Sequence, residues 1–451
     1  MAAMPSLHLI RTPGLGDTSY VFGHDGAAIV VDPQRDIDRL LEPIAEEGLE
    51  VRYVLETHLH NDYVSGGRDL ARETGAELVL PASAAPAYRH TPAFHLEEIG
   101  DPGLTIRPIH TPGHTPEHTS YAVLVDGALV GVFTGGSLLV GSAGRPDLLG
   151  PERKDTLARL QYRSVTRLAE LPDDTPVYPT HGEGSFCTAG GCGRITSTIA
   201  MEKAENPLLA VSDEDAFVDA LTSGLGPWPA YYRHMGPTNL YGPAPMRPLD
   251  LPTLGVAELS DPATAIVDIR GKEPFAAGHI PGSVGLELRD DTGVWAGWVL
   301  DHDASIVLVA DPGQDVDEAL RQLRRIGMDA TGVVWGLDAW TDAGLPLASY
   351  RTTDRRSFVE AIADGRTVLD VRMPNEWADG TIPGSRLVFA ADVVADGVPA
   401  DLQGEVWVAC GSGYRATAVA RWLEEAGLDL VILTEDGVPE VLEALATTPR
   451  S

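Results

Sequence analysis

The chain has 451 residues, of which 66 are acidic and 33 are basic, so its formal net charge at pH 7 is −33. Such a charge argues against a nucleic-acid partner or an anionic membrane, because both repel an acidic surface. The length exceeds that of an ordinary single domain, so about two to four domains are expected. No apolar run reaches the roughly 18 residues of a membrane span, and the N-terminus lacks a signal-peptide core, which predicts a cytoplasmic protein.

The first ~200 residues alternate short β-rich runs with turns and helical patterns, which is typical of an α/β fold. Residues 19–33 predict a hairpin, and residues 51–58 predict a strand that runs up to a histidine-rich loop. Residues 69–81 predict a helix, a glycine stop and a further strand. Residues 120–136 predict a second hairpin, and residues 152–171 predict an amphipathic helix.

Histidines collect at the ends of these strands. The stretch "ETHLHNDYVSGG" contains His58, His60 and Asp62, and two later loops supply His114 and His181. A catalytic metal site with an open coordination position needs such a set of ligands on several loops. We predict His58, His60 and His114 as metal ligands, with Asp62 and His181 as further candidates.

Residues 224–252 are crowded with proline, glycine and aromatic residues, which predicts a domain boundary or an ordered connecting arm that packs on something. Beyond it the chain repeats itself. Residues 265–283 and 367–385 align without gaps, and each combines a buried-strand pattern with Asp-x-Arg and Ile-Pro-Gly-Ser. Two tandem copies of one α/β domain are the simplest explanation.

The second copy contains a cysteine loop between a strand and a helix that is expected to begin near Ala416. Cys410 is the candidate nucleophile, and Arg415 is the candidate anion-binding residue. The loop amides between them and the positive end of the helix would favour a thiolate that carries sulfur as a persulfide. The persulfide loop consists of Gly411, Ser412, Gly413 and Tyr414.

The stretches "DVRMPNEWADGTIPGS" and "CGSGYRA" resemble the rhodanese family of sulfurtransferases over most of the last copy. The resemblance implies that Cys410 is the persulfide carrier. Thr381 stands where the family usually has a histidine, at a position that is largely structural. In the first copy Asp311 falls at the cysteine position and no arginine closes the loop, so we expect an inactive domain that packs or shapes a site.

The stretches "THLHNDYVSGG", "HTPGHTPEHTSY", "GRPDLLG" and "VYPTHGEGS" resemble the metallo-β-lactamase fold over roughly residues 5 to 220. More narrowly they are similar to its persulfide dioxygenase branch, a relative of glyoxalase II. That branch holds one iron and oxidises a thiol persulfide, typically glutathione persulfide, to sulfite with O2. The resemblance implies that Arg145 lies near the thiol carrier; the alternative is an ordinary salt bridge.

Two positions depart from that family pattern. Tyr63 stands where HxHxD is normally followed by histidine, and Gly136 stands where an aspartate normally ligates the metal. Three histidines still suffice for one Fe(II) or Zn ion, but they leave its charge without a first-shell carboxylate. Two-metal hydrolysis is therefore disfavoured, while one bound metal and a retained fold without metal both stay open.

Cys187 and Cys192 lie close to His181 in sequence. Three cysteines in the whole chain are too few for a disulfide scaffold and fit a reducing compartment. We expect a mainly structural role for these two, with redox or sulfur-relay chemistry as the alternative.

The sequence thus predicts an α/β protein of three domains. These are a metallo-β-lactamase-like αββα sandwich with its connecting arm (1–245), an inactive rhodanese-like domain (246–350) and a rhodanese domain with Cys410 (351–451). The expected function is the processing of low-molecular-weight persulfides, with glutathione or a similar thiol as the carrier. The alternatives are a glyoxalase II-like thioester hydrolase, and a non-catalytic N-terminal scaffold that leaves only sulfur transfer. Self-association as a homo-oligomer is compatible with each of them.

Overall fold

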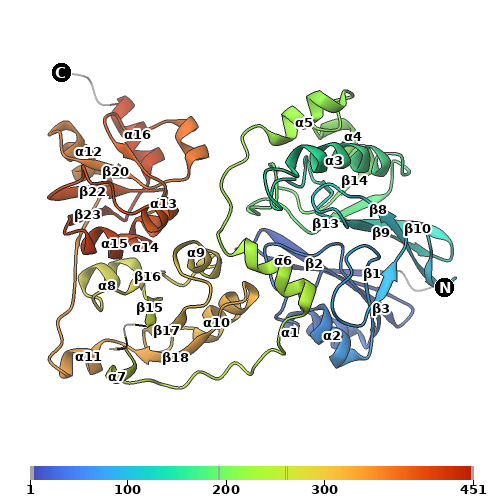
Figure 1. The fold of residues 1–451 in the computed structure, drawn as a ribbon, viewed down its shortest axis with the longest axis horizontal. Coiled ribbons are helices and arrows are strands. Elements are labelled where there is room, and N and C mark those ends of the chain that lie inside the picture. The colour runs from blue at the N-terminus through green and yellow to red at the C-terminus, as the bar shows by residue number, and fades with distance from the viewer. Residues whose placement is uncertain (1–4, 191–192, 260, 262, 448–451) are drawn as a thin grey trace. The chain divides into compact units, whose positions relative to one another are not determined.

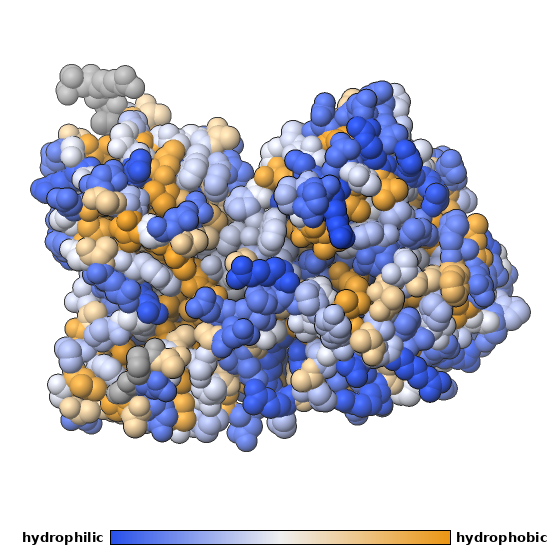
Figure 2. Space-filling model, viewed as in Figure 1, coloured by the Kyte–Doolittle hydropathy of each residue, from blue (hydrophilic) through white to orange (hydrophobic). Residues whose placement is uncertain are grey.

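The structure is a computed structural model that describes residues 5–190, 193–259, 261 and 263–447. The chain divides into two compact units, Met1–Pro248 with Arg324–Gly327, and Leu249–Leu323 with Met328–Ser451. On the face drawn in Figure 2, hydrophilic side chains are widespread and hydrophobic ones lie among them. Among the described residues, no helix is both long enough and apolar enough to cross a bilayer.

The first unit is built on two six-stranded sheets (Figure 1). The first sheet has the order β1 (Ser6–Thr12), β2 (Asp17–His24), β3 (Ala27–Val31), β4 (Glu50–Leu55), β5 (Glu77–Pro81) and β6 (Thr91–Ala93). The second sheet has the order β14 (Ser197–Thr198), β13 (Pro176–Pro179), β10 (Ala128–Gly135), β9 (Thr119–Val125), β8 (Leu104–His110) and β7 (Ile99–Asp101). A short ladder pairs β11 (Leu138–Leu139) with β12 (Ser142–Ala143).

The two sheets pack face to face, and helices cover their outer faces. Tyr20 and Phe22 of β2 belong to the core between the sheets, whereas Val21 between them packs with the helices, as the two-residue period of a strand requires. Helices α1 (Asp38–Glu47) and α2 (Gly67–Thr74) cover the first sheet. Helices α3 (Lys154–Leu168), α4 (Ile199–Glu205) and α5 (Glu214–Thr222) contribute to the core on the second sheet. The predicted αββα sandwich is confirmed.

Both predicted hairpins are confirmed, and each turns on an Asp-Gly pair. Asp25 and Gly26 have φ angles of 48° and 77°, and Asp126 and Gly127 have φ angles of 50° and 78°. These values match the type I′ turns that suit the twist of a hairpin.

The strand expected to run to His58 ends earlier, at Leu55, so its predicted end is wrong. The reason is local. The Thr57 N–H donates to the Asp32 carboxylate at 2.7 Å instead of to a neighbouring strand, which ends the ladder. The histidine motif therefore lies wholly on a loop.

The second unit contains two parallel sheets with the same strand order. The first has the order β16 (Val284–Gly285), β15 (Thr264–Asp268), β17 (Ser305–Ala310) and β18 (Ala330–Trp335). The other has the order β21 (Arg386–Leu387), β20 (Val368–Asp370), β22 (Glu405–Ala409), β23 (Asp429–Leu433) and β19 (Arg351–Thr353). Thr253 forms a parallel bridge to Val333 of β18. It thus takes the place in the first copy that β19, which pairs with β23, has in the second. The predicted tandem repeat is confirmed.

Helices complete each copy. The first copy has α7 (Val256–Leu259), α8 (Lys272–Ala277), α9 (Thr292–Val299), α10 (Val316–Arg325) and α11 (Asp338–Asp342). The second has α12 (Arg355–Ala363), the 3₁₀ helix η1 (Pro374–Asp379), α13 (Ala390–Ala395), α14 (Tyr414–Ala418), α15 (Ala420–Glu425) and α16 (Val438–Thr447). The helix expected from Ala416 begins two residues earlier and is interrupted at Val419.

Candidate functional sites

The structure gathers histidines from three strand-end loops into one buried cluster. His58 lies between β4 and α2, His114 lies between β8 and β9, and His181 follows β13. The ring centre of His58 is 4.9 Å from that of His114 and 5.3 Å from that of His181, and the latter two are 5.2 Å apart. All three side chains are buried. Residues that are far apart in sequence thus converge as a metal site requires.

Two carboxylates stand behind His181. Its Nδ1 lies 2.8 Å from Asp17 Oδ1 and 3.3 Å from Asp62 Oδ2, while its Nε2 lies 3.3 Å from Nε2 of His58. Burial raises the pKa of Asp17 and that of Asp62 to about 7. The carboxylates therefore orient the imidazole from its far side, an arrangement that is common behind metal-binding histidines.

His60 is engaged differently from the other histidines. Its Nε2 lies 3.2 Å from Glu56 Oε2, 3.3 Å from Asp32 Oδ1 and 3.0 Å from the Tyr63 hydroxyl. Burial alone would lower the pKa of His60, but the two acids outweigh it and raise that pKa well above its usual value. The phenol of Tyr63 thus hydrogen-bonds to His60.

The pKa values of His58 and His114 are shifted in the opposite direction from that of His60. Burial, followed by the neighbouring imidazoles, lowers the pKa of both well below the usual value. Both rings are therefore neutral at physiological pH, which is the protonation state that binds metal.

The cluster contains unpartnered polar atoms of the type that binds a cation. Within the described residues, His60 Nδ1 and His114 Nε2 are buried and make no hydrogen bond. Buried polar atoms are nearly always partnered, so orphans of metal-ligating type fit a bound ion. The groups whose ligand atoms lie within 4.8 Å of one another include His58 with His60 and His181, and His114 with His181 and Cys187. Each group offers three buried ligand atoms, which is the number that a mononuclear metal site needs, and His181 belongs to both groups.

The glycine at the expected aspartate position faces the ring of His114. A Cβ at Gly136 would lie 2.3 Å from His114 Cδ2, so the imidazole occupies the space that a side chain would need. The Gly136 N–H donates to His118 Nε2 at 2.9 Å, and His118 Nδ1 lies 2.9 Å from the Thr111 hydroxyl. Both ring nitrogens of His118 are therefore occupied within the protein. Sequence reasoning missed this residue, although it lies inside the quoted "HTPGHTPEHTSY" motif.

Arg145, expected near the thiol carrier, is buried with its guanidinium engaged. It binds both oxygens of Asp147 at 2.7 and 2.8 Å and donates to the carbonyls of Phe186 and Gly226 at 3.0 and 2.8 Å. Its own carbonyl lies 2.9 Å from His114 Nδ1. The structure places Arg145 as a support beneath His114, so its contact with substrate stays a prediction.

The connecting arm clamps the histidine loop. The arm carries α6 (Tyr232–Tyr241), and Asn239 of this helix donates to the carbonyls of His60 and Tyr63, both at 2.9 Å. Its Oδ1 accepts the Ser65 N–H at 2.9 Å, and the Tyr231 hydroxyl donates to the Asp62 carbonyl at 2.9 Å. The expectation that this aromatic arm packs on something is confirmed.

Asn239→Ala should destabilise the first unit by about 2–4 kcal/mol, because three buried main-chain groups lose their partner. We expect a lower urea midpoint in the metal-free protein. Thr238→Ala, at a half-buried neighbour on the same helix, is the control and should change the midpoint little. An Asn239→Ala midpoint equal to that of the wild type would show that the clamp does not stabilise the loop.

The cysteine loop of the second copy is tightly packed. Cys410 follows β22, is 1% exposed, and its carbonyl accepts the Val438 N–H at 2.9 Å. Gly413 has a φ of 80°, which a residue with a side chain adopts at a cost. A Cβ at Gly437 would lie 2.0 Å from the Gly411 carbonyl oxygen, so the next loop closes directly over this one.

Arg415 is fixed beside the cysteine by Glu376. Its guanidinium makes a two-pronged ion pair with that carboxylate, with Nη2 2.9 Å from Oε1. Burial alone would lower the pKa of Arg415, but the Glu376 carboxylate outweighs it and raises that pKa. Glu376 was not predicted, although it lies in the quoted "PNEW" stretch.

The first rhodanese copy reaches into this loop of the second. The Lys272 ammonium, at the start of α8, donates to the carbonyls of Ser412 and Thr434 at 2.9 and 2.5 Å. The Arg289 guanidinium lies 4.4 Å from the ring centre of Tyr414. In the first copy itself, exposed Asp311 follows β17 where Cys410 follows β22. The first copy thus supports the cysteine loop of the second copy.

Lys272→Met should lower kcat/KM for sulfur transfer about tenfold, because two carbonyls that shape the loop lose a charged donor. Lys272→Arg keeps a charged donor at this position and should retain most of the wild-type kcat/KM. Equal kcat/KM in wild type and Lys272→Met would contradict this supporting role.

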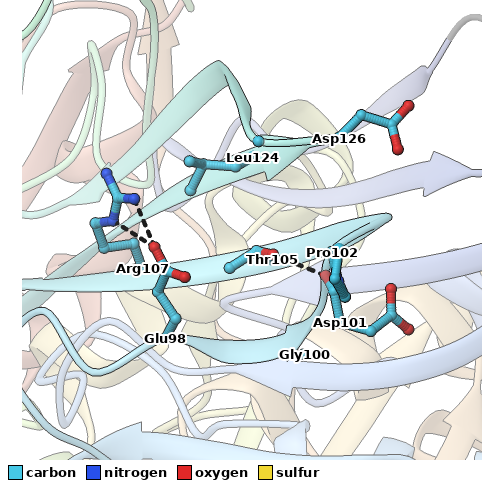
Figure 3. A pocket seen from close by; sticks show the side chains of 9 residues that line it. Glu98, Gly100, Asp101, Pro102, Thr105, Arg107, Leu124 and Asp126 are labelled. Carbon is cyan, nitrogen blue, oxygen red and sulfur yellow. Dashed lines mark hydrogen bonds and ion pairs between the residues drawn. The ribbon is translucent and has the colours of Figure 1, made fainter.

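Two cavities differ in whether a histidine of the cluster lines them. The one in Figure 3 lies on the sheet surface around Arg107 and Glu98, and its lining contains none of the cluster histidines. A smaller cavity of about 30 Å³ reaches His181, and its lining includes Arg11 and Arg194. Of these two cavities, only the second is lined by a histidine of the cluster.

Comparison with known proteins agrees with this architecture. The metallo-beta-lactamase superfamily matches residues 12–181, and the rhodanese-like domain matches residues 254–343 and 354–444. A metallo-beta-lactamase structure from Staphylococcus aureus subsp. aureus COL aligns with 74% of this chain and 99% of its own, at 28% identity and a TM-score of 0.68. That similarity extends past the first unit.

Curated relatives match the N-terminal part. A hydroxyacylglutathione hydrolase of Methylobacillus flagellatus is 34% identical over 35% of this chain, and the match spans only 58% of that relative. A probable metallo-hydrolase of Burkholderia pseudomallei is 30% identical over 41% of this chain and 70% of the relative. The chain belongs to the metallo-β-lactamase superfamily and carries two rhodanese-like domains after its metallo-β-lactamase domain.

Proposed function

We propose that this protein is a sulfur-metabolism enzyme that acts on low-molecular-weight persulfides through both halves of the chain. The observation that carries the proposal is Cys410, held at the end of β22 beside the Arg415–Glu376 ion pair. A rhodanese loop of this kind handles sulfane sulfur, and a persulfide is the substrate that a fused oxidising domain could share with it.

In the rhodanese half, the Cys410 thiolate attacks the outer sulfur of thiosulfate. A sulfur–sulfur bond to Cys410 forms, the sulfur–sulfur bond of thiosulfate breaks, and sulfite leaves with the bonding electron pair. Cys410 is left as a persulfide, which a thiolate acceptor attacks in the reverse sense. Arg415 stabilises the anionic sulfur during both transfers.

In the N-terminal half, His58, His114 and His181 would hold one divalent metal, with His60 and Asp62 as further ligand candidates. Fe(II) supplies redox chemistry toward O2, which Zn lacks. The balanced reaction is RSSH + O2 + H2O → RSH + SO3²⁻ + 2 H⁺. The choice of glutathione as the thiol carrier is supported by the similarity to hydroxyacylglutathione hydrolases.

A glyoxalase II-like thioester hydrolase is the second candidate, favoured by the similarity to hydroxyacylglutathione hydrolases. Such chemistry uses metal-activated water and commonly a pair of metal ions. Gly136 offers no side-chain ligand, and the Tyr63 hydroxyl is bonded to His60. These two features disfavour a second metal ion here.

Metal analysis and two substrates separate the candidates. We expect about one iron per chain after anaerobic reconstitution, and sulfite from glutathione persulfide. A hydrolase would instead bind about two zinc ions and cleave S-lactoylglutathione. A chain that binds no metal and forms no sulfite, yet transfers sulfur, would leave the N-terminal domain as a scaffold and overturn the dioxygenase half of the proposal.

The charge of −33 disfavours a nucleic acid or an anionic membrane as the partner. A cytoplasmic location fits the low cysteine content. Immunoblotting of separated cytoplasmic and membrane fractions would test this location.

A further inference from the structure

The candidate metal site lacks an obvious anionic donor on the side of His114. Gly136 has no side chain to offer, and the nearby carboxylates of Asp17 and Asp62 face His181 Nδ1. They therefore lie across the ring from Nε2, which faces His58. Neutral imidazoles alone leave a divalent ion with its full charge in a buried site, which is unfavourable.

Cys187 lies where an anionic donor is needed. Its thiol is 0% exposed, and its sulfur lies within 4.8 Å of a ring nitrogen of His114 and of His181. The sulfur also lies 3.8 Å from the Tyr232 hydroxyl, which is a long distance for a hydrogen bond. His114 Nε2 is fully buried and makes no hydrogen bond within the described residues.

The main chain holds Cys187 and His114 in one rigid arrangement. The Arg145 N–H donates to the Cys187 carbonyl at 3.0 Å, and the Arg145 carbonyl lies 2.9 Å from His114 Nδ1. The Arg145 guanidinium also holds the Phe186 carbonyl at 3.0 Å. The main chain of Arg145 therefore holds both the backbone of Cys187 and the ring of His114 in place.

We propose that Cys187 is a metal ligand alongside His114 and His181, and that its thiolate supplies the negative charge that Gly136 cannot. On binding, the sulfur–hydrogen bond breaks, the proton leaves to solvent and the sulfur donates an electron pair to the ion. A thiolate is a softer donor than a carboxylate and raises the preference for Fe(II), Zn or Co(II) over Mg. The proposal rests on the metal half of the proposed function but not on its reaction.

Cobalt is the probe, because a thiolate ligand gives Co(II) a near-ultraviolet sulfur-to-metal charge-transfer band that histidine and carboxylate ligands do not give. Apoprotein is titrated with Co(II) without oxygen. We expect this band in the wild type and in Cys410→Ser, and its loss in Cys187→Ser and Cys187→Ala. Affinity for Co(II) should fall at least about tenfold in both Cys187 variants.

Cys192→Ser is the matched control, since Cys192 lies outside the described residues but is the other cysteine of the same domain. It should keep the band. Circular dichroism of the apoproteins checks that each variant is folded, and the two Cys187 substitutions guard against a defect specific to one of them.

The possible results separate the ligand assignment from the metal site itself. Co(II) bound without the band, a band that survives in Cys187→Ser, or a band lost only in Cys192→Ser overturns the assignment while leaving a metal site in place. No Co(II) binding at all by the wild type removes the metal half of the proposed function and the inference with it.

Discussion

Cys410→Ser should lose thiosulfate sulfurtransferase activity by more than about 10²-fold, because a hydroxyl at this position cannot form a persulfide. The side chain is 1% exposed in a tightly packed loop, and serine has nearly the same volume, so the fold should be kept. The measurement is sulfite release from thiosulfate with cyanide as the sulfur acceptor, together with the thermal midpoint.

The first rhodanese copy provides the matched control. Asp311 follows β17 as Cys410 follows β22, and its side chain is exposed. Asp311→Ala should therefore leave sulfur transfer unchanged. If Cys410→Ser kept full sulfurtransferase activity, the assignment of the rhodanese nucleophile would be wrong.

His114→Ala should abolish stable metal binding and, with it, sulfite formation from glutathione persulfide. The ring supplies an unpartnered nitrogen to a buried cluster, and its loss leaves the site without one of its neutral imidazole donors. We expect the dissociation constant for metal to rise on the order of 10²-fold or more, since loss of merely supporting groups costs 10- to 100-fold. Metal per chain after gel filtration is the readout.

His95→Ala serves as the control, because that histidine is exposed on the same domain, away from the cluster. It should retain metal and sulfite formation. Sulfur transfer at Cys410 should be unaffected in both variants. Retention of one metal per chain in His114→Ala would place the ion elsewhere in the domain.

The loops that carry the candidate metal ligands and Cys410 could be predicted, because each is short and follows a strand. His58, His114, His181 and Cys410 all lie in local motifs whose spacing is readable without the fold. The αββα sandwich and the tandem repeat followed from the same local patterns of hairpins and repeated strands.

What sequence reasoning missed is contributed by distant segments. Asp17 lies on β2 and Asn239 on the connecting arm, yet both contact the histidine cluster or its loop. Lys272 belongs to the copy without a cysteine and supports the loop of the other. Such contacts arise only when packing brings separate elements together, and a carboxylate or a lysine alone has no distinguishing pattern.

The significance of Cys187 also depends on the fold. Its sequence position near His181 was visible, but a structural role was expected there. The structure adds that His114 Nε2 is buried without a hydrogen bond and that the His114 ring fills the space beside Gly136. Only with these neighbours does the thiol stand out as a candidate ligand.

The most direct test of the central claim is oxygen uptake by Fe(II)-loaded Cys410→Ser with glutathione persulfide. This variant isolates the N-terminal domain from sulfur transfer. The account predicts one O2 consumed and one sulfite formed for each persulfide. Hydrolysis of S-lactoylglutathione by the same preparation, with neither oxygen uptake nor sulfite from the persulfide, would contradict it.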